Sequence, residues 1–209
     1  MPPPKVRLAR LRLPLATPRL LLRSYSFKDA SRIFGWFQDR EITRTIPLWE
    51  DYTLGDGRDF VLRSRRSLRS GEAYNLAITL RGTGELIGGV GLEILSPRER
   101  RAHIGYWVAR PYWGQGVASE AASRVCQEAL RTLRMHRIET GVARGNPASR
   151  KVLARLGFRS EGWARDRFLI DGRYRDCEMM GLLAEEFRPY RAPPRALRTA
   201  GDPEGISSK

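Results

Sequence analysis

Two glycines, Gly114 and Gly116, stand between an apolar, strand-like stretch and a segment with the apolar spacing of a helix. Because glycine has no Cβ, it lets the backbone approach a bulky anion closely. A helix N-terminus adds unpaired N–H groups and the positive end of the helix dipole. The spacing therefore predicts a phosphate-binding turn. It fits neither a Walker A loop, which needs Lys-Ser/Thr after the last glycine, nor the G-x-G-x-x-G fingerprint of dinucleotide sites.

A second loop and helix follow at residues 146–158. Asn146 can cap a helix, and Pro147 suits the first helical position, where no N–H is needed. The apolar face and the terminal glycine of this helix are Val152, Leu153, Leu156 and Gly157. The block therefore predicts a second helix whose N-terminus is defined by a side-chain cap.

Both blocks resemble cofactor motifs of the GNAT superfamily of N-acetyltransferases, above all its RimJ/RimL-like branch. Trp113–Ala118, which reads Trp-Gly-Gln-Gly-Val-Ala, is similar to the coenzyme A pyrophosphate loop of that family. Asn-x-x-Ser at Asn146, followed by a helix and Leu-Gly-Phe, resembles its second cofactor motif. The opening Thr-Pro-Arg-Leu-Leu-Leu-Arg at Thr17 is also similar, and the resemblance spans residues 17–187.

The resemblance implies transfer of an acetyl group from acetyl-CoA directly to a primary amine, without a metal. Backbone amides of Gln115–Ala118 would bind the pyrophosphate. The strand end at Trp107–Ala109 would pair with the pantetheine arm, and the Val108 N–H would polarise the thioester carbonyl. Asn146 would hydrogen-bond the pantetheine or hold neighbouring strands apart. The implied cofactor-binding set is Trp107, Val108, Ala109, Trp113, Gly114, Gln115, Gly116, Val117, Ala118, Asn146 and Ser149.

The sequence offers more than one candidate for the catalytic base. His103 occupies the strand position where many members of the superfamily carry Glu, and a neutral imidazole with a pKa near ~6.5 can accept a proton. Glu93, at the end of the preceding strand, is the rival base, and either residue could simply be a polar strand residue. Ser149 matches a serine near the leaving thiolate in RimJ/RimL-like proteins, although a serine in a first helical turn also satisfies a backbone N–H. Leu153 replaces the tyrosine that other members use, and Phe168 replaces a glutamate of RimL-like enzymes.

The acceptor is expected to be a protein N-terminal α-amine of the ribosomal-protein type. Small amines, such as an aminoglycoside or a polyamine, are the alternative acceptors. An alternative of another class is a coenzyme A-binding or RNA- and ribosome-binding module with little catalysis. No covalent enzyme intermediate is expected, because Cys126 and Cys177 lie outside the motifs.

The 209 residues suffice for one domain with tails, and the net charge is +15. Basic residues outnumber acidic ones most strongly near the two ends, so we expect a basic extension at 1–16, an acetyltransferase domain at 17–187 and a disordered basic tail at 188–209. The tails could contact ribosomal RNA by counterion release. No apolar run is long enough for a membrane span, and two distant cysteines favour a reducing cytoplasm. The sequence is compatible with a homodimer.

The fold class expected is α/β, as a GNAT fold with a mixed sheet of about seven strands and about four flanking helices. Helices are predicted at residues 26–39, 53–70, 116–132 and from 146, and strands at 20–27, 73–80, 85–95, 101–109, 137–143, 158–170 and 174–183. Strand alternation places His103 and Gly105 on one face. On the helix from 116, Glu120 is expected on the solvent side with Arg124 and Glu128, as an i, i+4 series.

Overall fold

A computed structural model describes residues 8–44, 46 and 52–198 of the chain. An eight-stranded mixed sheet runs through it in the order β1-β2-β3-β4-β5-β6-β8-β7. The strands are β1 (Leu15–Ala16), β2 (Leu20–Ser24), β3 (Ala73–Leu80), β4 (Leu86–Ser96), β5 (Arg101–Val108), β6 (Arg137–Ala143), β7 (Arg159–Ile170) and β8 (Arg173–Leu183). All neighbouring strands are antiparallel except β5 and β6, which are parallel.

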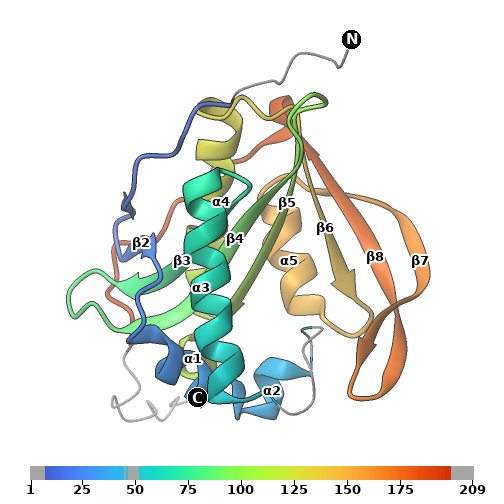
Figure 1. The fold of residues 1–209 in the computed structure, drawn as a ribbon. Helices are drawn as coiled ribbons and strands as arrows, with labels where there is room; N and C mark the ends of the chain where they lie inside the picture. Colours follow the sequence, from blue (N-terminus) through green and yellow to red (C-terminus); the bar gives the residue numbers. More distant parts are fainter. Residues whose placement is uncertain (1–7, 45, 47–51, 199–209) are drawn as a thin grey trace, which may run out of the picture.

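Helices cover both faces of this sheet (Figure 1). They are α1 (Asp29–Phe37), α2 (Arg40–Thr43), α3 (Leu54–Ser70), α4 (Val117–Arg131) and α5 (Pro147–Arg155). α3 packs on β3 and α1 at the front in this view, whereas α4 packs on β4 and β5 from the other side. The prediction of a mixed sheet with helices on its faces is therefore confirmed. β1 and α2, too short to carry a periodic signal, were not predicted.

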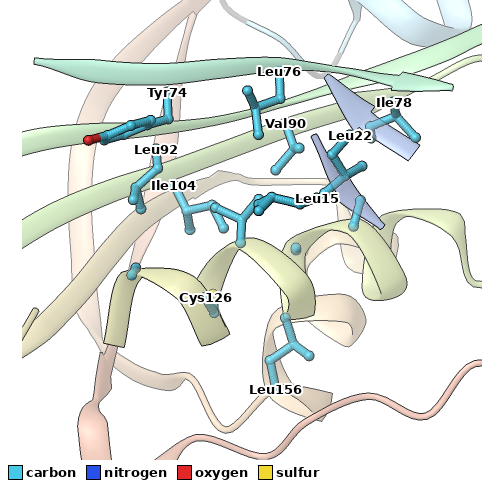
Figure 2. Close-up of a cluster of buried hydrophobic side chains, with 14 of the residues drawn as sticks. Leu15, Leu22, Tyr74, Leu76, Ile78, Val90, Leu92, Ile104, Cys126 and Leu156 are labelled. Carbon is cyan, nitrogen blue, oxygen red and sulfur yellow. The ribbon is translucent and has the colours of Figure 1, made fainter. Parts of the chain in front are cut away.

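The main core lies between the sheet and helices α4 and α5. Figure 2 shows side chains from the inner face of the central strands, such as Leu76, Val90 and Ile104, pointing toward Cys126 of α4 and Leu156 after α5. A smaller cluster on the opposite face joins α1 and α3 to the sheet through Tyr25, Ala30, Ile33, Val61, Ala77 and Leu86. The two cores fix the helices on either side of β5, which carries the candidate site.

β5 and β6 pair over only three residues. Arg101, Ala102 and His103 pair with Arg137, Ile138 and Glu139, and the pairing ends there. Beyond His103 the two strands diverge, and α5 lies behind the divergence (Figure 1). The divergence therefore leaves the backbone edge of β5 without β6 as a partner from Gly105 onward.

Local signals explain the helix boundaries near the site. The Thr53 side chain accepts a hydrogen bond from the Asp56 N–H, and the Asp56 carboxylate accepts one from the Thr53 N–H, so a capping box starts α3. At α5 the Asn146 Oδ1 accepts from the Ser149 N–H at 3.0 Å, as its capping role predicted. Pro147 takes the first helical position.

Two expectations differ from the structure. Glu120 was placed on the solvent side of α4, but it is 3% exposed. Its carboxylate is buried because it binds Arg19 and Thr17, which come from the start of the chain.

Residues 188–198 lie against the folded core, where Tyr190 and Leu197 pack, whereas the sequence predicted disorder from residue 188. Residues 199–209 and 1–7 of the two predicted tails lie outside the described residues. No helix in the described part of the chain is long and apolar enough to cross a membrane.

Candidate active site

The turn before α4 has the backbone that its glycines predict. Gly114 and Gly116 have φ values of +71° and +79°, in the left-handed region that glycine adopts without a Cβ penalty. Gly116 is the N-cap residue of α4, and as a glycine it has no side chain that could cap this helix end. The first N–H groups of α4 are thus left to a ligand or solvent, as an anion site requires.

A buried ion pair holds this turn in place. Arg19 Nε lies 2.7 Å from Glu120 Oε2, and the two side chains are 8% and 3% exposed. Thr17 Oγ1 and the Arg19 N–H donate to the other carboxylate oxygen, at 2.6 and 3.0 Å. The same guanidinium donates through Nη2 to the Gln115 carbonyl at 3.0 Å. Arg19 therefore connects the first turn of α4 to the loop in front of it.

The end of β5 presents its backbone to the divergence. The Ala109 N–H donates to the Ile87 carbonyl on the β4 side. Since backbone groups alternate in direction along a strand, the N–H groups of Tyr106 and Val108 point to the β6 side, beyond Glu139, the last residue of β6 that pairs with β5. Trp113 Nε1 donates to the Val108 carbonyl at 2.6 Å, which ties the loop to the strand end. In the described part of the chain β6 does not pair with these two N–H groups, so an open strand edge leads from the α4 turn into the divergence.

Tyr106 connects β5 to α5 across the divergence. Its hydroxyl lies 3.0 Å from Ser149 Oγ and donates to the Ser149 carbonyl at 3.3 Å. Burial raises the pKa of the Tyr106 phenol, so it stays protonated and able to donate a hydrogen bond. Sequence reasoning selected Ser149 but missed Tyr106. Strand alternation could have found it, since Tyr106 must face α5 if His103 and Gly105 face the other side.

His103 lies on the opposite face of β5, between two carboxylates. It is paired across the sheet with Glu93 of β4 and with Glu139 of β6. Burial lowers the pKa of the imidazole below 6.5, and this effect outweighs the opposing influence of Glu93 and Glu139. A Cβ built on Gly105 would meet only His103 Cε1, at 3.8 Å. The space beside the imidazole is therefore open, as the sequence predicted.

The two candidate bases differ in their surroundings. Glu93 is exposed, whereas His103 is only partly exposed and neutral near pH 7. Glu139 is held by Arg137, at 2.9 Å, and by Arg101, at 3.5 Å. Its charge is thus compensated. His103 lies at the closed end of the divergence, where β5 and β6 still pair. It can accept a proton without first breaking an ion pair, whereas Glu139 cannot.

The structure brings the predicted cofactor residues together but separates them from the predicted bases. Trp107–Ala109, Trp113–Ala118, Asn146 and Ser149 surround the end of β5 and the N-termini of α4 and α5. His103 and Glu93 lie at the other end of the divergence. Five residues of extended strand, about 17 Å, separate His103 from Val108. That length suits an extended ligand lying along β5.

Comparison with known proteins identifies the family. The acetyltransferase (GNAT) domain family matches residues 19–159. The chain belongs to the GNAT acetyltransferase family. It is 32% identical over 173 residues to the uncharacterized N-acetyltransferase p20 of Bacillus licheniformis, covering 83% of this chain and 97% of that protein. This GNAT chain is also 27% identical over 200 residues to the [ribosomal protein uS5]-alanine N-acetyltransferase of Escherichia coli (strain K12), covering 90% and 96% of the two chains.

A solved structure supports the same fold for this GNAT protein. Mycobacterium smegmatis RimJ in complex with CoA-disulfide has a TM-score of 0.73 and 27% identity, and the match covers 86% of this chain and 88% of that one. The relatives therefore include ribosomal-protein acetyltransferases, and the chain is an N-acetyltransferase by family.

Proposed function

We propose that this chain binds acetyl-CoA along β5 and transfers the acetyl group directly to the α-amine of a protein N-terminus in the cytoplasm. The divergence of β5 and β6 beyond His103 carries this proposal, because it opens a strand edge that ends at the glycine turn of α4. The pyrophosphate would bind the first N–H groups of α4. The pantetheine arm would run along β5 as an added strand, paired with the Tyr106 and Val108 N–H groups.

The thioester would lie at the closed end of the divergence. The Ile104 N–H faces Glu139, the last residue of β6 that pairs with β5, so the nearest N–H to His103 on the open edge is that of Tyr106, which would donate to the carbonyl oxygen. The sequence pointed to Val108 for this role. Its N–H lies on the same open edge, two residues nearer the α4 turn, and is the alternative donor to the carbonyl oxygen.

The transfer step uses both faces of β5. The amine reaches the thioester from the face that carries His103, its nitrogen forms the new bond to the carbonyl carbon, and its proton passes to the neutral imidazole. The carbon–sulfur bond breaks, and its electron pair leaves on the thiolate, which the Ser149 and Tyr106 hydroxyls stabilise from the α5 side. Burial raises the pKa of Cys126, which agrees with direct transfer rather than a cysteine intermediate.

The chemistry of the base favours an α-amine acceptor. An α-amine has a pKa of roughly 7.7–8.0, so a useful fraction is neutral near pH 7.5, whereas a lysine ammonium titrates near ~10.4. A base whose pKa lies below 6.5 suits the weaker of these two amines. The homology to an enzyme that acts on the alanine of ribosomal protein uS5 supports the same acceptor class. A small polyamine remains the second candidate acceptor.

The test is the position of the acetyl group on a peptide that offers both amines. A peptide with a free α-amine and an internal lysine is incubated with acetyl-CoA, and fragmentation in a mass spectrometer locates the added group. We expect acetylation of the α-amine alone, and no product from the same peptide with a blocked N-terminus. Acetylation of the lysine, or faster turnover of spermidine than of the peptide, would contradict the proposal.

A further inference from the structure

An arginine-lined cavity of about 360 Å³ opens beside the glycine turn of α4. Gly114–Gly116 and Arg19 form one wall. The rest of the lining comes from Arg155, at the C-terminal end of α5, and from Tyr190, Pro193, Arg195, Ala196 and Arg198 of the C-terminal segment. The cavity therefore joins the proposed pyrophosphate site to residues that follow the last strand of the fold.

Specific contacts hold the C-terminal segment, residues 188–198, across this region. The Arg188 N–H donates to the Leu156 carbonyl, and the Tyr190 N–H donates to Ser123 Oγ of α4, both at 2.9 Å. At its far end the Arg198 N–H donates to Gln115 Oε1 at 2.8 Å. The segment is thus attached to α5, to α4 and to the loop itself, so its side chains have a defined place beside the cavity.

The charges in the cavity exceed what a pyrophosphate alone would use. Arg19 is neutralised by Glu120. Arg155, Arg195 and Arg198 form no ion pair with any described residue, and none of the described residues lining the cavity is acidic. The first turn of α4 already supplies N–H groups to a pyrophosphate. Three uncompensated guanidinium groups therefore fit a further, strongly charged anionic group.

We propose that Arg155, Arg195 and Arg198 bind the phosphate monoester on the ribose of coenzyme A, so that the C-terminal segment makes the enzyme selective for coenzyme A over its 3′-dephospho form. This inference rests on the proposed use of acetyl-CoA. A phosphate monoester carries roughly −1.5 to −2 charge at pH 7 and three acceptor oxygens. Guanidinium groups match that geometry with paired, charge-assisted hydrogen bonds. The third phosphate is the group of this cofactor that the α4 turn does not already serve.

The experiment compares two ligands on the full chain by isothermal titration in phosphate-free buffer. Coenzyme A and 3′-dephospho-coenzyme A are titrated into the unmodified protein, into the double variant Arg195→Gln, Arg198→Gln, and into Arg155→Gln. Arg191→Gln is the matched control, because Arg191 is an exposed arginine of the same segment that does not line the cavity. Unchanged circular dichroism and melting temperature establish that each variant is folded.

We expect the unmodified protein to bind coenzyme A at least about tenfold more tightly than the dephospho form, as loss of a charge-assisted contact implies. The double variant should lose most of this preference while its Kd for the dephospho form stays the same, and Arg191→Gln should change neither value. Equal affinities in the unmodified protein, or a variant that weakens both ligands alike, would overturn the inference while leaving acetyl-CoA use intact. Binding of neither ligand would instead overturn the proposed function, and this inference with it.

Discussion

Arg19 and Glu120 form a buried ion pair, 2.7 Å from Nε to Oε2, between the start of β2 and the first turn of α4. The guanidinium also donates to the Gln115 carbonyl, so the pair ties the glycine turn to the sheet. A turn that binds phosphate with backbone N–H groups depends on its shape rather than on any side chain of its own. The ion pair therefore holds the glycine turn in the shape that the proposed cofactor site requires.

Replacing Glu120 should be costly. Glu120→Gln leaves the Arg19 guanidinium buried without a counter-charge, which destabilises proteins by about 3–5 kcal/mol. The exposed pair of Arg44 and Glu41 gives the control, since Glu41→Gln should cost about 0.5 kcal/mol or less. Urea unfolding of both variants measures the difference. Equal, small losses in the two variants would show that the buried pair stabilises neither the fold nor the glycine turn.

The two glycines of the turn should respond differently to alanine. Both have a positive φ, so each substitution costs about 1–2 kcal/mol of backbone strain. A Cβ on Gly116 would also clash with the Tyr190 hydroxyl, whereas a Cβ on Gly114 meets nothing within 4 Å. Thermal unfolding should thus show a larger loss for Gly116→Ala than for Gly114→Ala. Adding Tyr190→Phe should recover part of the excess, because Tyr190 Cζ would still lie 3.2 Å from the added Cβ, and equal losses in the two single variants would contradict the contact.

Ser149 and Tyr106 should act as one unit in catalysis. If their hydroxyls stabilise the leaving thiolate, Ser149→Ala and Tyr106→Phe should each lower kcat by about 100-fold with little change in KM for acetyl-CoA. Because the two hydroxyls lie 3.0 Å apart, the double variant should be little worse than either single one. Fully additive losses would show that the two side chains act separately.

His103 should set the acidic limit of activity. As a base it must be neutral, and burial lowers its pKa below 6.5, so its limb of the kcat/KM profile should lie below that value, apart from the fall caused by protonation of the acceptor α-amine at roughly 7.7–8.0. His103→Gln should lower kcat/KM by about 100-fold or more and remove this limb of the profile. His136→Gln is the control, because His136 is exposed and outside the site. An unchanged profile in His103→Gln would assign the base elsewhere, with Glu93 the next residue to replace.

His103 should also make the free energy of unfolding depend on pH. Since the native pKa of His103 lies below the unfolded value of 6.5, the unfolded chain binds more protons between these two pH values. The free energy of unfolding should therefore decrease as the pH falls below about 6.5, and less steeply in His103→Gln. Denaturant unfolding from pH 7.5 to 5 measures both slopes. Parallel slopes for the two proteins would contradict the assigned pKa direction.

Sequence reasoning succeeded where the signal is local. Asn146, Pro147 and the glycines at 114 and 116 determine their own backbone, so the helix starts could be predicted. It failed where the partner is distant in the chain. Nothing near Glu120 indicates that Arg19, about a hundred positions earlier, will cover it, and helical spacing alone places it toward solvent. The contact of residues 188–198 with Gln115 likewise depends on tertiary packing, which a basic, proline-rich composition conceals.

Thermal unfolding with and without saturating acetyl-CoA, with ATP as the phosphate control, tests the central claim that this chain holds acetyl-CoA at the α4 turn. At 100 times Kd a ligand of the native state stabilises by about 2.7 kcal/mol, which raises the melting temperature of a chain of this size by roughly 5–10 °C. We expect that rise with acetyl-CoA and no comparable rise with ATP. An unchanged melting temperature, or equal rises with both ligands, would contradict it.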